Sequence, residues 1–177
     1  LVFCAAVASA SPLVYIVNGA QQFGTVNLAT GAFHQIGPDT PEGQAGLVPG
    51  PNGSLLSLTY SGKLDSINTA TGLTSVIGAT GFADCTLPTS PCGPTSVAAF
   101  GNFGGAFYAT DFANDLYTVN TATGAVTLIG HTGIPALPFS PVSTNPDGSF
   151  NFYDENLFGA GGKLYANFDA ATFNPVT

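Results

Sequence analysis

Residues 64–78 read LDSINTATGLTSVIG, and nearly the same phrase occurs twice more, as FGTVNLATGAFHQIG at 23–37 and as LYTVNTATGAVTLIG at 116–130. The glycines of the Thr-Gly steps are Gly31, Gly72 and Gly124, so successive copies lie 41 and 52 residues apart. Each phrase alternates apolar and polar residues on both sides of a short turn, which is typical of a β-hairpin. The sequence therefore contains an internal repeat of about 40–50 residues that is built from short strands.

A further strand precedes each hairpin. Residues 13–16 align with 106–109 at an offset of 93 residues, and residues 163–166 repeat the same pattern. Another strand is expected before that one, at 96–101 and again near 155–159. Four antiparallel strands in each repeat, called A to D from the axis outward, make the blade of a β-propeller.

The repeats predict an all-β protein, a β-propeller of about three and a half four-stranded antiparallel blades. Residues 12–37 supply strands B, C and D of one blade, 43–78 and 95–130 supply two complete blades, and 150–177 begin a fourth. Propellers close with 4–8 blades, so we expect the 177 residues to be a fragment of a longer ring. A β-sandwich does not account for three near-identical hairpins at regular spacing, and solenoid repeats are usually shorter.

The composition excludes some partners. The net charge is -8, there is no arginine, and the two lysines, Lys63 and Lys163, lie 100 residues apart. Nucleic acids and anionic membrane surfaces are bound through clusters of basic residues, which this sequence cannot form. A cationic ligand or a metal ion remains electrostatically compatible with the chain.

The first ten residues, LVFCAAVASA, predict the C-terminal part of a signal peptide. They are apolar, then small, and they end in Ala8-Ser9-Ala10, a pattern that signal peptidase recognises, with cleavage expected before Ser11. The alternative is a first buried strand. Residues 11–177 are then the partial propeller, and the protein is expected to be secreted or at the cell surface.

Two cysteines remain after such cleavage, Cys85 and Cys92, in the segment GFADCTLPTSPCGP. An even number of cysteines in an exported chain, placed close together in one loop, favours a disulfide. The alternatives are a two-ligand metal site, for which no further His or Cys lies nearby, and free thiols.

Two positions that are the same in all three copies of the phrase mark the turn between strands C and D. The asparagines Asn27, Asn68 and Asn120 open it, and the glycines Gly31, Gly72 and Gly124 are expected to supply a positive φ there. These turns and the A–B connections emerge on one side of the ring, which we call the turn face.

The opposite side, the loop face, carries the B–C loops and the long D–A connections 79–94 and 131–154. Variable segments of repeat proteins collect on the binding face, so we expect ligands there. The candidate binding residues are Asp84, Asp111, Asp115, His131, Asp147, Asp154 and Glu155. For the segment around Asp111 and Asp115, which is not a repeated ligand set, a solvated turn is the simpler interpretation.

Catalytic and metal-binding chemistry is sparse. His131, aligned with Pro38 of the first blade, is the one general-base candidate on the loop face, and no G-x-S-x-G nucleophile motif accompanies it. Asp147, Asn151 and Asp154 offer oxygen ligands for calcium, but their spacing does not match an EF-hand and a Pro-Asp-Gly-Ser turn explains them more simply. No other cofactor and no catalytic residue is predicted.

The hairpins 64–78 and 116–130 resemble the repeats of bacterial secreted β-propellers related to the YVTN and NHL-like groups, many of which carry a C-terminal sorting anchor. Proteins of these groups serve as interaction scaffolds, adhesins and ligand-binding modules, and some as enzymes, and the resemblance implies a surface anchor outside these 177 residues. Because these residues offer almost no catalytic chemistry, we expect a non-enzymatic scaffold that binds an extracellular protein or polysaccharide. The alternative is a secreted hydrolase or lyase whose key residues lie partly outside them. Fold alone does not decide between the two.

Overall fold

The computed structural model describes residues 12–86, 92–133, 156–160 and 163–167. These residues form four antiparallel sheets and a single short 3-10 turn, η1 (Pro51–Gly53). The first sheet contains β1 (Leu13–Val17), β2 (Gln22–Asn27) and β3 (Phe33–Asp39). The second contains β4 (Gln44–Pro49), β5 (Leu55–Thr59), β6 (Lys63–Ile67) and β7 (Thr74–Ala79).

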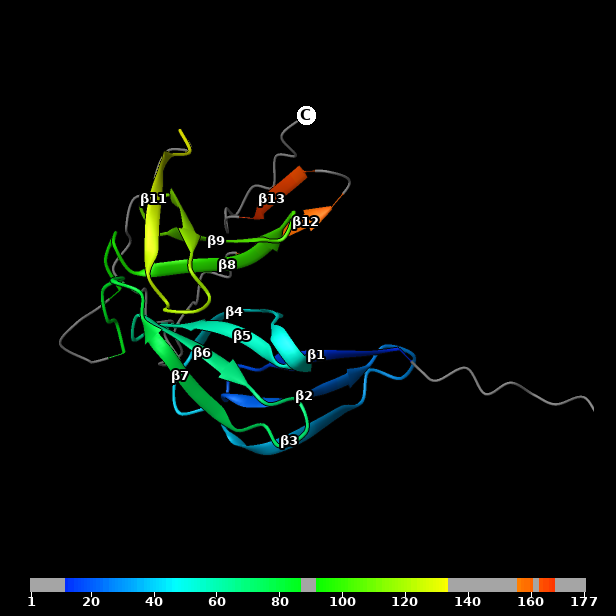
Figure 1. Cartoon of the computed structure of the whole chain (residues 1–177). Helices are drawn as coiled ribbons and strands as arrows, with labels where there is room; N and C mark the ends of the chain where they lie inside the picture. Colours follow the sequence, from blue (N-terminus) through cyan, green and yellow to red (C-terminus); the bar gives the residue numbers. More distant parts are fainter. Residues whose placement is uncertain (1–11, 87–91, 134–155, 161–162, 168–177) are drawn as a thin grey trace, which may run out of the picture.

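The third sheet contains β8 (Val97–Phe103), β9 (Ala106–Asp111), β10 (Asp115–Val119) and β11 (Val126–His131), and the fourth pairs β12 (Asn156–Ala160) with β13 (Lys163–Asn167). Strands are hydrogen-bonded in sequence order within every sheet. The first strands of successive blades lie side by side, β4 next to β8 and β8 next to β12, as Figure 1 shows. The expected β-propeller fold is confirmed, with two complete blades between two partial ones.

The segment predicted to be a signal peptide, residues 1–10, lies outside the described residues. Within the part of the chain that the structure describes, no helix is long and apolar enough to cross a membrane.

The main core lies between the second and third blades. Leu58 and Leu64 of the second blade are fully buried, and they belong to one apolar cluster with Val97 and Phe100 of the third. Because side chains alternate between the two faces of a strand, each middle blade can bury one face against the blade before it and the other against the blade after it. This alternation turns the repeated hairpins into a continuous ring segment.

The C–D turn has the same backbone in all three blades. The side-chain oxygen of Asn68 accepts a hydrogen bond from the Ala70 N–H at 2.9 Å, and the Gly72 N–H bonds the Asn68 carbonyl at 2.8 Å. The first and third blades repeat both bonds, and φ is 73°, 71° and 82° at Gly31, Gly72 and Gly124. Such φ values disfavour most residues with a Cβ, so glycine is the preferred residue at this position.

The same turns join the blades. The backbone of Gly72 lies directly against Ile36 and Gly37 on strand β3 of the preceding blade, so that a Cβ on Gly72 would overlap the Ile36 carbonyl oxygen. Gly124 makes the equivalent contact with Gly78 on β7. The Ile-Gly step that ends each phrase is therefore the site on which the turn of the next blade packs.

Candidate binding face

The loop face has a repeated brace that the sequence analysis missed. In each blade, a threonine directly after strand D donates two hydrogen bonds, one from its N–H and one from its hydroxyl. Both bonds go to the carbonyl of the last residue of the B–C loop in the same blade. The hydroxyl bonds are Thr40 to Gln21 at 3.1 Å, Thr80 to Gly62 at 2.8 Å and Thr132 to Asn114 at 2.8 Å. This brace fixes each D–A connection to the neighbouring B–C loop.

The accepting residue of each brace has left-handed backbone geometry. The φ values are 63° at Gln21, 73° at Gly62 and 64° at Asn114. Asparagine and glycine adopt this conformation readily, whereas glutamine does so at some cost. Three different residues thus hold one backbone shape, which is why no repeated letter marked the loop in the sequence.

Each B–C loop is also capped at its start by a polar side chain. Asn18 accepts hydrogen bonds from the N–H groups of Ala20 and Gln22, both at 3.0 Å. Asp111 accepts the equivalent bonds from Ala113 at 3.0 Å and from Asp115 at 2.9 Å. In the second blade Thr59 accepts one such bond from the N–H of Lys63 at 3.2 Å.

Asp111 is therefore a buried structural residue, and the interpretation of this segment as a solvated turn is wrong at that position. Its side chain is 1% exposed, and its second oxygen accepts a hydrogen bond from the Tyr117 hydroxyl at 2.9 Å. Burial raises the pKa of Asp111 although these hydrogen bonds act in the opposite direction. Burial, and then the bond to Asp111, raise the pKa of Tyr117. Asp111 therefore organises the backbone of its loop, and its side chain is not exposed on the loop face.

Asp115 and His131 form a pair at the edge of this loop. They are opposite one another in the register of β10 and β11, and the Nδ1 atom of His131 contacts the Asp115 carboxylate. Asp115 is mostly buried, whereas the His131 side chain is 80% exposed. The carboxylate thus holds one ring nitrogen while the rest of the imidazole reaches solvent.

The register also corrects the alignment of His131 with Pro38. In the first blade Gln22 pairs with Asp39, and in the second Lys63 pairs with Ala79. His131 is therefore equivalent to Asp39. The gapless offset of 93 residues fails after Gly37 because the bulge in β3 contains more residues than the bulge in β11.

The second blade places charges at the same edge. Lys63 lies 3.1 Å from the Glu42 carboxylate, and this hydrogen bond raises the pKa of Lys63. Asp65, two residues further along β6, is almost fully buried, and burial followed by the charge of Glu42 raises its pKa. Sequence reasoning did not select these three residues as site candidates, because their proximity depends on strand pairing and not on spacing along the chain.

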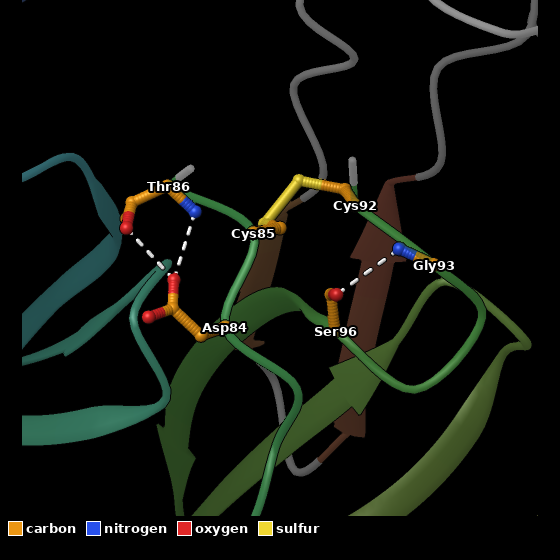
Figure 2. The surroundings of a disulfide bond; sticks show 6 residues. All are labelled: Asp84, Cys85, Thr86, Cys92, Gly93 and Ser96. Atoms are coloured by element: carbon orange, nitrogen blue, oxygen red, sulfur yellow. Dashed lines mark hydrogen bonds between the residues drawn. A yellow bond between two sulfur atoms is a disulfide. The ribbon is translucent and has the colours of Figure 1, made fainter. Parts of the chain in front are cut away.

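A disulfide links Cys85 to Cys92 across the D–A connection, as predicted, with the two Cα atoms 4.5 Å apart. Figure 2 shows that hydrogen bonds fix both sides of the bridge. Asp84 accepts bonds from the N–H and the hydroxyl of Thr86 at 2.9 and 2.7 Å, which lower its pKa, and the Ser96 hydroxyl accepts a bond from the N–H of Gly93 at 3.1 Å.

This bridged connection contacts the B–C loops on both sides. The Cys85 N–H bonds the Tyr60 carbonyl at 2.9 Å in the second blade, and the Ala113 N–H of the third blade bonds the Pro94 carbonyl at 3.0 Å. The disulfide thus lies in a connection that is hydrogen-bonded to the B–C loops of two blades.

Four of the predicted binding residues lie on the described part of the loop face: Asp84, Asp111, Asp115 and His131. The others, Asp147, Asp154 and Glu155, and the calcium candidate Asn151, lie outside the described residues. Within the described part of the chain, no group of three or more His, Cys, Asp or Glu side chains is arranged to hold a metal ion.

No family model matches the chain, and no curated protein matches it. Glutaminyl cyclase from Myxococcus xanthus is a similar solved structure, with a TM-score of 0.55 and 19% identity over 90% of this chain and 65% of that one. Virginiamycin B lyase from Staphylococcus aureus has a TM-score of 0.46 and 18% identity over 94% and 55% of the two chains. The chain thus spans less than two thirds of either protein, and the similarity to glutaminyl cyclase shows the fold alone.

Proposed function

We propose that this protein is an extracytoplasmic, non-enzymatic binding module whose loop face takes an extracellular protein or polysaccharide. The main support is that loop geometry repeats while loop chemistry varies. The residues that cap the B–C loops are Asn18, Thr59 and Asp111, yet the backbone they organise is similar. A stable surface with interchangeable side chains suits recognition, for which loops on a rigid scaffold are commonly used.

The proposed compartment rests on two features. Disulfides persist in oxidising surroundings, and Cys85 and Cys92 form one on this face. The predicted signal peptide at residues 1–10 agrees with export, and a surface anchor outside these residues would hold the module at the cell exterior.

Binding screens against extracellular polysaccharides and secreted proteins would test the proposal. On the loop face, Asp84→Ala and His131→Ala change exposed side chains. On the turn face, Leu28→Ala and Thr30→Ala change equally exposed ones and serve as matched controls. We expect at least a tenfold loss of affinity, about 1.4 kcal/mol, from the first pair and none from the second. If the turn-face variants abolish binding while the loop-face variants retain it, the assignment of the face is wrong.

A second candidate is a secreted hydrolase or lyase, which the Asp115–His131 pair favours. A carboxylate that holds one nitrogen of an imidazole orients the other as a general base, an arrangement used in several enzyme classes. If the protein degraded a polysaccharide from the same panel, and His131→Ala and Asp115→Asn both removed that activity, the enzyme would replace the binding module. Binding without turnover would keep the first proposal.

A further inference from the structure

The chain contains two Asn-Gly dipeptides, Asn18-Gly19 and Asn52-Gly53. Asparagine is a thermally labile residue, and a following glycine makes it more so, because glycine has no Cβ to shield its backbone nitrogen from the asparagine side chain. Asn18 opens a B–C loop on the loop face, whereas Asn52 lies in η1, within the A–B connection of the second blade on the turn face. The reaction needs a side chain that can turn, so the hydrogen bonds of each asparagine decide its reactivity.

Asn18 is held through both its side chain and its backbone. Its Oδ1 atom accepts bonds from the N–H groups of Ala20 and Gln22, and its Nδ2 atom donates to the side-chain oxygen of Gln22 at 2.9 Å. Its own N–H donates to the Gln22 carbonyl at 3.1 Å, and its carbonyl accepts a bond from the N–H of Gln21 at 2.9 Å. Moving its Cγ atom onto the nitrogen of Gly19 therefore breaks several of these bonds.

Asn52 lacks these restraints. Within the described residues its side chain makes no hydrogen bond, and Pro51, Asn52 and Gly53 are all exposed. The connection is closed by two backbone bonds that involve neither residue of the dipeptide, from Gly50 to Ser54 at 2.9 Å and from Ser54 to Pro51 at 3.0 Å. The Asn52 side chain can therefore turn toward the nitrogen of Gly53 without losing a hydrogen bond.

We propose that Asn52 is a site of spontaneous deamidation and that the fold protects Asn18 from the same reaction. The backbone nitrogen of Gly53 attacks Cγ of Asn52 and closes a succinimide ring. The bond from Cγ to Nδ2 breaks, and that nitrogen leaves as ammonia with the proton of the Gly53 N–H. Water then opens the ring at either carbonyl. Cleavage at Cγ gives aspartate, whereas cleavage between the Asn52 backbone carbonyl carbon and the Gly53 nitrogen gives isoaspartate.

Both products change the turn face. The described turns of this face in the first three blades, at 27–32, 50–54, 68–73, 104–105 and 120–125, contain no charged residue, so either product introduces a carboxylate there. Isoaspartate also lengthens the backbone beside Gly53, whose carbonyl accepts a bond from the Thr69 hydroxyl at 2.9 Å. The modification thus lies where the A–B connection contacts the C–D turn of the same blade, away from the proposed binding face.

Peptide mapping by mass spectrometry, after incubation of the folded protein at mildly alkaline pH, tests the proposal. We expect aspartate and isoaspartate to accumulate at Asn52. Conversion at Asn18 should be at least about tenfold slower, because each hydrogen bond that must break adds to the barrier. The control is the same protein in guanidinium chloride, where the hydrogen bonds of Asn18 are lost and the two dipeptides should convert at similar rates.

Four results would overturn the proposal. The first is an unchanged Asn52 in the folded protein, and the second is an equal rate at Asn18 and Asn52 in that state. The third is aspartate without isoaspartate at Asn52, which would indicate direct hydrolysis of the side chain. The fourth is an Asn18 that stays equally slow in denaturant, because neighbouring residues in the sequence, and not the fold, would then protect it.

Discussion

The two faces of this ring repeat in different ways. On the turn face the sequence itself repeats, because Gly72 and Gly124 touch the backbone of the preceding blade and have φ values that disfavour other residues. On the loop face the residue that caps the B–C loop changes from blade to blade, since Asn18, Thr59 and Asp111 all make this cap. Contact between backbones fixes glycine at the turns, whereas several polar side chains can cap the B–C loop.

The turn residues stabilise the contacts between blades, whereas exposed loop residues can change without disturbing those contacts. Substitution at a turn glycine disturbs two blades at once, whereas substitution of an exposed loop residue such as Asp84 disturbs one loop. The repeated phrase therefore reports the architecture. The proposed function places ligand specificity in the variable loops.

The largest effect is expected from Gly72→Ala. The new Cβ overlaps the Ile36 carbonyl oxygen, and φ is 71°. We expect a loss of about 3–5 kcal/mol in the free energy of unfolding, of which ~1–2 comes from the backbone conformation and the rest from the overlap.

Gly31→Ala is the matched control for this change. It has the same turn and a φ of 73°, but a Cβ there meets nothing within 4 Å. Only the conformational cost of about 1–2 kcal/mol should remain. Equal losses for the two variants in urea denaturation would show that the contact between blades contributes nothing.

Much of the architecture was predictable because it depends on these backbone constraints. The three phrases, their asparagines and their glycines gave the hairpins and the order of the blades. The brace made by Thr40, Thr80 and Thr132 was not recognised, because its acceptors are a glutamine, a glycine and an asparagine. The burial of Asp111 and the equivalence of His131 with Asp39 depend on strand register and a bulge, which spacing alone does not reveal.

The next effect in size concerns the loop face. The disulfide between Cys85 and Cys92 closes a short loop, with a sequence separation of 7 residues. The double variant Cys85→Ser/Cys92→Ser should lose about 2–3 kcal/mol, because the unfolded chain regains the entropy of that loop. A reductant should lower the melting temperature of the native protein toward that of the variant and leave the variant unchanged. If the reductant lowers both melting temperatures equally, the bridge is not the cause.

A smaller effect is expected when the hydroxyl bond of one brace is removed. Thr80→Val removes a hydroxyl that donates to the Gly62 carbonyl at 2.8 Å and is almost fully buried. We expect a loss of about 1 kcal/mol, or roughly 2–4 °C in Tm. Thr132→Val removes the equivalent bond at an exposed position and should cost less. A larger loss for Thr132→Val would mean that burial does not set the strength of the brace.

The smallest effect is expected for Asp65→Asn, and it should appear in how the stability of the folded protein depends on pH. Burial, and then the charge of Glu42, raise the pKa of Asp65 above its ordinary value of 3.8. The folded state therefore holds the proton more tightly than the unfolded state, so the favourable contribution of Asp65 is complete below pH 3.8 and is lost as the pH rises through the raised pKa. An uncharged asparagine escapes this loss, and we expect it to be the more stable variant at pH 7 by less than ~1 kcal/mol. The advantage should shrink on acidification, as measured by thermal unfolding across this range.

Asp84→Asn should behave in the opposite way, because hydrogen bonds from Thr86 lower the pKa of Asp84 and stabilise its charged form. If both variants followed the same pH profile, net charge would explain the result, and the buried and exposed carboxylates of the loop face would be electrostatically equivalent.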